Sequence, residues 1–188
     1  MFGRFSLLTC IAAVALIVAA VPAPVAGQLG GYAVVGYGFR SQKGYYPATS
    51  GPMIRVSALL RVAGPVALGG EVGHYWLGET REFDVVKRDR ILTLAFCMEF
   101  GKPRPGISPR ITFGVTGNLV STMIKTDTYT STLSGYLMGP HIGLAIVRKP
   151  ASATLALRAE VRTALMLGLS GESFSQNWLT SVSLGVAF

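Results

Sequence analysis

Apolar and polar residues alternate with a period of two along much of this chain. The clearest case is residues 53–63, where Ile54, Val56 and Ala58 alternate with Arg55 and Ser57. The same period recurs over residues 90–101 and 110–122. Alternation of this kind puts successive side chains on opposite sides of an extended backbone, so each segment is predicted to be a β-strand with two different faces.

Residues 154–166 are the best test of this interpretation, because their alanines and leucines would also suit a helix. Arg158, Glu160 and Arg162 decide between the two. In a helix, at about 100° per residue, Glu160 would lie on the side opposite to the two arginines, whereas in a strand all three share one face. We therefore predict a strand.

Eight such segments are predicted, at residues 31–40, 53–63, 67–77, 90–101, 110–122, 135–147, 154–166 and 178–188. Each is close to the ~9 to 11 residues that a tilted strand needs to cross a bilayer. The connections alternate between tight ones rich in Pro or Gly (64–66, 102–106, 148–152) and longer polar ones (41–51, 78–87, 125–134, 168–177). Short turns on one side and long loops on the other are typical of outer-membrane barrels. The predicted fold class is all-β, an eight-stranded antiparallel transmembrane up-and-down β-barrel with both termini on the periplasmic side.

The apolar face is assigned to lipid and the charged face to the interior. A soluble barrel would have to enclose every apolar side chain of these strands, and the charged face suits the smaller inner surface better. Aromatic residues near the strand ends are expected to form two interfacial girdles. Pro140 lies inside the sixth segment, where a closed barrel has no free edge, so we expect a bulge there or a strand that starts later.

Residues 1–27 are predicted to be a cleavable signal peptide, and residues 28–188 the outer-membrane β-barrel domain. Arg4 precedes an uncharged apolar stretch over 6–21, and small residues with two prolines follow. An uncleaved membrane anchor is the alternative. Removal of Arg4 lowers the net charge from +8 to +7 and leaves Cys97 as the single thiol, so no internal disulfide is expected.

The chain resembles the small outer-membrane β-barrel family that includes OmpX and the membrane domain of OmpA. The resemblance rests on GGYAVVGYG at 30–38, GGEVG at 69–73, GPHIGL at 139–144 and the terminal segment VSLGVAF at 182–188. It implies a fold and a compartment, the bacterial outer membrane. It also implies that Val182, Leu184, Val186 and Phe188 form the C-terminal signal that the barrel-assembly machinery reads, with Val186 standing where an aromatic residue is common.

The inner face is predicted to carry a network of charges. Its members are Arg55, Arg61, Glu71, Glu99, Arg110, His141, Arg158, Glu160 and Arg162. Unpaired charges would be costly in so narrow an interior, so salt bridges and water are expected to fill and plug it. A small conducting pathway or a ligand pocket is the alternative. The three carboxylates are a poor acid/base group, because the nearby arginines hold them ionised.

The two histidines are the remaining candidates for chemistry. Lipid A deacylases of the outer membrane use a membrane-facing His and Ser two residues apart on one strand. The residue two after His74 is Trp76, and the residue two after His141 is Gly143, so neither histidine has that serine. His74 is assigned to the interfacial belt and His141 to a hydrogen-bonded position in the lumen.

No catalytic residue, cofactor or metal site is therefore predicted. With 50% hydrophobic and 14% charged residues, disorder is excluded. The predicted function is a non-enzymatic, monomeric barrel that serves envelope integrity or surface interaction. Its expected partners are outer-membrane lipid, lipopolysaccharide and the barrel-assembly machinery, and nucleic acid is not expected. A lipid A-modifying enzyme and a narrow pore are the alternatives.

Overall fold

The computed structural model describes residues 29–42, 48–82, 84–102, 104, 106–150, 152, 154–170 and 173–188. The predicted signal peptide at 1–27 and the predicted first mature residue, Gln28, lie outside these ranges. Within them no helix is long and apolar enough to cross a membrane.

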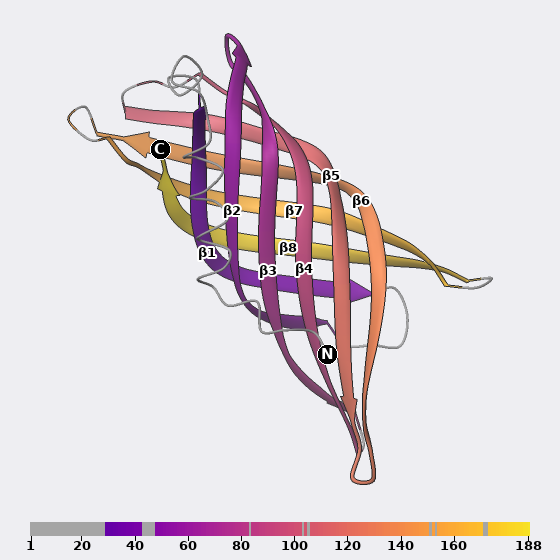
Figure 1. The fold of residues 1–188 in the computed structure, drawn as a ribbon. Helices are drawn as coiled ribbons and strands as arrows, with labels where there is room; N and C mark the ends of the chain where they lie inside the picture. Colours follow the sequence, from indigo (N-terminus) through magenta and orange to yellow (C-terminus); the bar gives the residue numbers. More distant parts are fainter. Residues whose placement is uncertain are drawn as a thin grey trace.

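Eight β-strands make up the described part of the chain. They are β1 (Leu29–Gln42), β2 (Thr49–Ala63), β3 (Val66–Glu82), β4 (Val85–Phe100), β5 (Gly106–Lys125), β6 (Thr130–Lys149), β7 (Ala156–Ser170) and β8 (Ser173–Ala187). Each strand pairs antiparallel with the next, and β8 pairs with β1 to close the barrel (Figure 1). The predicted fold class is confirmed.

The two ends of the barrel differ in what they carry. We call the end that holds the β2–β3, β4–β5 and β6–β7 connections and the C-terminal Phe188 the turn end, and the opposite end the loop end. Gly64 lies in the turn between β2 and β3 with φ +48°, a left-handed conformation that glycine adopts without steric cost. At the loop end the β5–β6 and β7–β8 hairpins extend in different directions (Figure 1).

Among the described residues, the long polar loops predicted at the loop end are mostly strand. β5 runs to Lys125 and β6 begins at Thr130, so only four residues connect them, and β7 runs to Ser170 and β8 begins at Ser173. The residues around the β5–β6 connection include many threonines, which favour extended backbone. Hydrogen bonding between the paired strands therefore continues past the segments that alternation had identified.

Pro140 causes neither a bulge nor a late start of β6. The register between β5 and β6 is constant through the pair of Val115 with Pro140. On the other side, β6 pairs with β7 at Met138 and again from His141, and Pro140 has no partner on β7. The missing N–H is accommodated by a local gap in the pairing of β6 with β7, so the prediction of a bulge or a later strand start was wrong.

The predicted assignment of the two faces holds along every strand. Outward apolar side chains are largely exposed, and they include Val35, Leu94, Phe96, Val115, Ile142, Leu144, Leu157, Val161 and Leu184. We call this outward surface the apolar belt. Inward side chains on the same strands are buried, among them Arg55, Thr112 and Asn118. An apolar exterior around a polar interior is the arrangement that a bilayer requires of a barrel.

Candidate functional site

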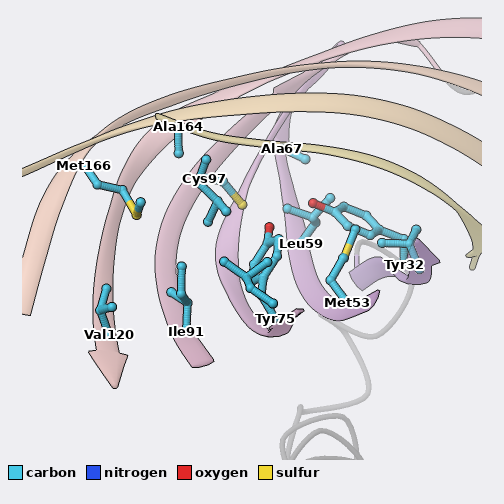
Figure 2. Packing of buried hydrophobic residues seen from close by; sticks show 13 residues of the cluster. Tyr32, Met53, Leu59, Ala67, Tyr75, Ile91, Cys97, Val120, Ala164 and Met166 are labelled. Carbon is cyan, nitrogen blue, oxygen red and sulfur yellow. The ribbon is translucent and has the colours of Figure 1, made fainter. Parts of the chain in front are cut away.

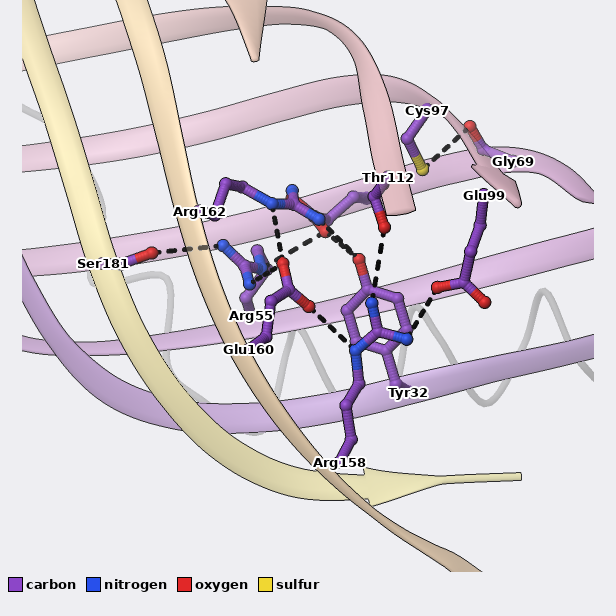
Figure 3. A network of polar contacts seen from close by, with 11 residues as sticks. Tyr32, Arg55, Gly69, Cys97, Glu99, Thr112, Arg158, Glu160, Arg162 and Ser181 are labelled. Carbon is purple, nitrogen blue, oxygen red and sulfur yellow. Dashed lines mark hydrogen bonds and ion pairs between the residues drawn. The ribbon is translucent and has the colours of Figure 1, made fainter. Parts of the chain in front are cut away.

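Glu160 lies at the centre of the charged interior. The alternation of β7 turns Arg158, Glu160 and Arg162 toward the inside, where all three are buried. One carboxylate oxygen of Glu160, Oε1, accepts hydrogen bonds from Arg55 Nη2 at 2.7 Å and from Arg162 Nε at 2.9 Å. The other, Oε2, accepts one from Arg158 Nε at 2.8 Å (Figure 3). One carboxylate is therefore shared by three guanidinium groups.

The other two inner carboxylates extend this network on both sides of Glu160. Glu71 forms an ion pair with Arg162 Nη1, and its Oε2 lies 3.3 Å from Arg55 Nε. Glu99 Oε2 accepts a hydrogen bond from Arg158 Nη1 at 2.6 Å. Glu71 thus faces Arg55 and Arg162, and Glu99 shares Arg158 with Glu160. These pairings offset the cost of removing the charges from water.

Tyr32 is a member of this network that the sequence analysis missed. Its hydroxyl donates to Glu71 Oε2 at 2.5 Å and accepts from Arg162 Nη2 at 2.8 Å. The guanidinium of Arg158 lies over its ring, 3.8 Å from the ring centre. The signal was present in the sequence, because Tyr32 is out of phase with the outward Tyr37 and Phe39 on the same strand.

The structure places all the predicted lumen residues on the inner side of the barrel and joins seven of them through ion pairs. The seven are Arg55, Glu71, Glu99, Arg110, Arg158, Glu160 and Arg162, and we call them the ion network. Arg61 lies apart at the turn end, where it donates to the carbonyl oxygen of Gly64 at 2.7 Å.

His141 is buried on the inner wall, as predicted. Neither Nδ1 nor Nε2 has a hydrogen-bond partner among the described residues. Its cross-strand neighbours are Gly114 on β5 and Ala164 on β7, and neither has a polar side chain. The register of these two strands places no polar side chain directly opposite His141, so the hydrogen bond predicted for it stays a prediction.

Apolar side chains fill the interior between the ion network and the loop end. They belong to one buried cluster and comprise Met53, Tyr75, Leu77, Ile91, Val120, Met166 and Leu179, which we call the apolar layer (Figure 2). The sequence predicted a network of charges in the lumen, and no apolar layer was predicted. Yet the inward positions of β2 and β7 already change from Arg55 to Met53 and from Arg162 to Met166 toward the loop end.

A second polar cluster lies beyond the apolar layer, closer still to the loop end. Arg40 Nη1 pairs with Asp89 Oδ2 at 2.6 Å, and its Nε donates to Asn177 Oδ1 at 3.2 Å. Thr122 donates to Asp89 Oδ1 at 2.7 Å. This ion pair was not predicted from the sequence, because Arg40 and Asp89 lie at or beyond the ends of the predicted strands.

The outer surface carries the predicted interfacial aromatics and His74. Tyr37, Phe39, Trp76, Tyr136 and Trp178 point outward on the loop-end halves of their strands, and Phe188 points outward at the turn end. The ring of His74 stacks on that of Trp76, with 4.2 Å between the ring centres. The cross-strand neighbours of His74 are Ile54 and Leu92, and neither carries a nucleophile.

The residues of the predicted C-terminal assembly signal lie on one face of β8 and just after it. Val182, Leu184, Val186 and Phe188 all point outward and are at least partly exposed. The backbone N–H and C=O of Phe188 each bond to Gly31 at 3.0 Å, so the chain end is held against β1.

No family model matches the sequence, and no curated protein is significantly similar to it. Solved structures are similar in fold. Neisserial surface protein A aligns with a TM-score of 0.64 and 13% identity, over 85% of this chain and 96% of that one. The attachment invasion locus protein Ail of Yersinia pestis aligns with a TM-score of 0.52 and 10% identity, over 85% and 98%. A major outer membrane protein from Thermus thermophilus gives a TM-score of 0.52 and 17% identity, over 85% and 98%.

The chain therefore has the fold of the small eight-stranded outer-membrane β-barrels, and the predicted resemblance is confirmed at that level. The predicted location in the bacterial outer membrane agrees with this fold and with the apolar belt.

Proposed function

We propose that this protein is a non-enzymatic, monomeric barrel of the bacterial outer membrane, whose lumen is closed to solutes by its own side chains. The observation that carries the proposal is the ion network, in which Glu160 is bonded by three arginines and its side chain is 0% exposed. An eight-stranded barrel is just wide enough for its interior side chains to fill it.

The order of layers along the lumen supports closure. A solute entering from the turn end meets the ion network, then the apolar layer, then the pair of Arg40 with Asp89. An ion would have to displace buried, bonded guanidinium groups and then cross a section lined by apolar side chains. Both steps oppose conduction, because each removes the ion from water without an equivalent partner.

The outer wall supports a role without catalysis. A lipid-facing base acts on lipid only when a nucleophile or an activated water lies within hydrogen-bond reach. His74 instead stacks on Trp76 and has aliphatic neighbours on both adjacent strands. These contacts suit a residue of the interfacial belt.

The loop end supports surface interaction over transport as the role of the barrel. The β5–β6 hairpin extends beyond the part of β6 that pairs with β7, and Tyr129, Leu133 and Tyr136 on it are each more than half exposed. Two of the similar structures are named a surface protein and an attachment protein. The proposed partners are outer-membrane lipid and lipopolysaccharide, with the barrel-assembly machinery during biogenesis.

Planar-bilayer recording of the folded protein tests closure. The expected result is a baseline current with no stepwise conductance. If steps appear, two tryptophan variants separate the lumen from defects at the lipid boundary: Met53→Trp adds bulk inside the barrel, and Val115→Trp adds it to the apolar belt. Steps that Met53→Trp reduces and Val115→Trp leaves unchanged would contradict a closed lumen and support the narrow pore.

A further inference from the structure

A cavity of about 300 Å³ lies at the turn end of the barrel, on the far side of the ion network from the apolar layer. Most of the charged side chains that line it are cationic. Five cationic side chains and one carboxylate line it: Arg61, Arg104, Arg110, Lys149, Arg158 and Glu99. The volume is at the lower end of the range for small-molecule sites.

Glu99, the one acidic side chain of the lining, does not neutralise it. Glu99 is bonded by Arg158 Nη1 at 2.6 Å and lies 3.8 Å from Arg110 Nη1. Arg61 donates to the carbonyl oxygen of Gly64, which carries no formal charge. The cavity therefore keeps an excess of positive charge, and walls of low dielectric strengthen its attraction for an anion.

Arg110 is the most informative residue of the cavity. Its side chain is 9% exposed, and its Nη1 donates to the carbonyl oxygen of Gly101. Its Nε is buried and has no hydrogen-bond partner among the described residues. A buried donor without a partner is costly in a folded protein. An anion in the cavity would attract the Arg110 guanidinium through its charge.

We propose that this cavity binds a small polyanion with phosphate or carboxylate groups, held by the Arg110 guanidinium and by Lys149 and Arg104 at the same mouth. Guanidinium groups match the paired oxygens of both anions with parallel hydrogen bonds. The site goes beyond the proposed closed barrel, since it opens at the turn end and needs no passage through the lumen. In the proposed orientation it faces the periplasm.

Calorimetric titration of the folded, detergent-solubilised protein tests the site with two probes, inorganic pyrophosphate and citrate. Saturable binding of one molecule per barrel is expected for at least one probe, and the stronger probe identifies the anion class. Arg110→Gln should weaken that binding about ten- to a hundredfold, the usual effect of losing a hydrogen bond to a charged group.

Arg148→Gln is the matched control, because Arg148 adjoins Lys149 on β6 but is exposed, lies on the outward phase and does not line the cavity. Binding to it should equal that of the unaltered protein. If Arg110→Gln does not fold, Lys149→Gln, an exposed position at the mouth, should weaken binding severalfold. Absence of saturable binding by both probes, or equal losses in the cavity variants and Arg148→Gln, would overturn the proposal. The conductance recording is independent of these outcomes.

Discussion

Glu160 shows how much one residue contributes to a charged interior. Its two oxygens accept bonds from Arg55, Arg158 and Arg162 at 2.7 to 2.9 Å. Glu160→Gln keeps the shape of the side chain but leaves three buried guanidinium groups without their shared anion. We expect a loss of about 3 to 5 kcal/mol in the free energy of unfolding, measured by urea titration in lipid vesicles.

Glu79→Gln is the control for this measurement. Glu79 forms its ion pair with Arg88 near the loop end, where both side chains are nearly half exposed. Such a pair contributes about 0 to 1 kcal/mol. Equal losses in the two variants would contradict a structural role for the ion network.

At the scale of the element, the cost of a charge on the outward face of a strand depends on its depth in the bilayer. Leu94 points outward from the middle of β4 and is 59% exposed, and Val62 points outward at the turn end of β2. Leu94→Arg should lower the free energy of unfolding in lipid vesicles by ~2 to 4 kcal/mol, and Val62→Arg by about 0 to 1 kcal/mol. The cost of a charge falls toward the interface. The same penalty at both positions would mean that the apolar belt does not span a bilayer.

At the scale of the whole molecule, closure between β1 and β8 depends on the chain end. The backbone of Phe188 bonds to Gly31, while its ring is half exposed on the outer wall. Phe188→Ala removes the ring and keeps both bonds. We expect the purified variant to refold, and expect most of the heat-modifiable, assembled band to be lost from the outer membrane of expressing cells.

Leu155→Ala is the control, since Leu155 is comparably exposed at the turn end but lies outside β8. It should assemble normally. If Phe188→Ala also assembles normally in cells, the C-terminal residues are not an assembly signal in this protein.

Alternation and the turn residues between segments were enough to predict the strand count, the order of the strands and the face that each residue occupies. Alternation is a local property of extended backbone, so Arg158, Glu160 and Arg162 could be placed on one inner surface without knowing what lay opposite. The sequence also determined that these charges needed partners, because an eight-stranded barrel leaves little room for water.

Which inner residues meet depends on how the barrel closes. Tyr32 and Glu71 are 39 residues apart and Arg55 and Glu160 are 105 apart, and each pair is joined because the barrel closes with particular registers. The same closure left His141 beside Gly114 and Ala164, gathered the apolar layer, and brought five cationic side chains to the lining of one cavity. Contacts across a lumen depend on the registers of all eight strands and on the shear of the barrel. Local alternation in the sequence predicts which face a residue occupies but not these registers.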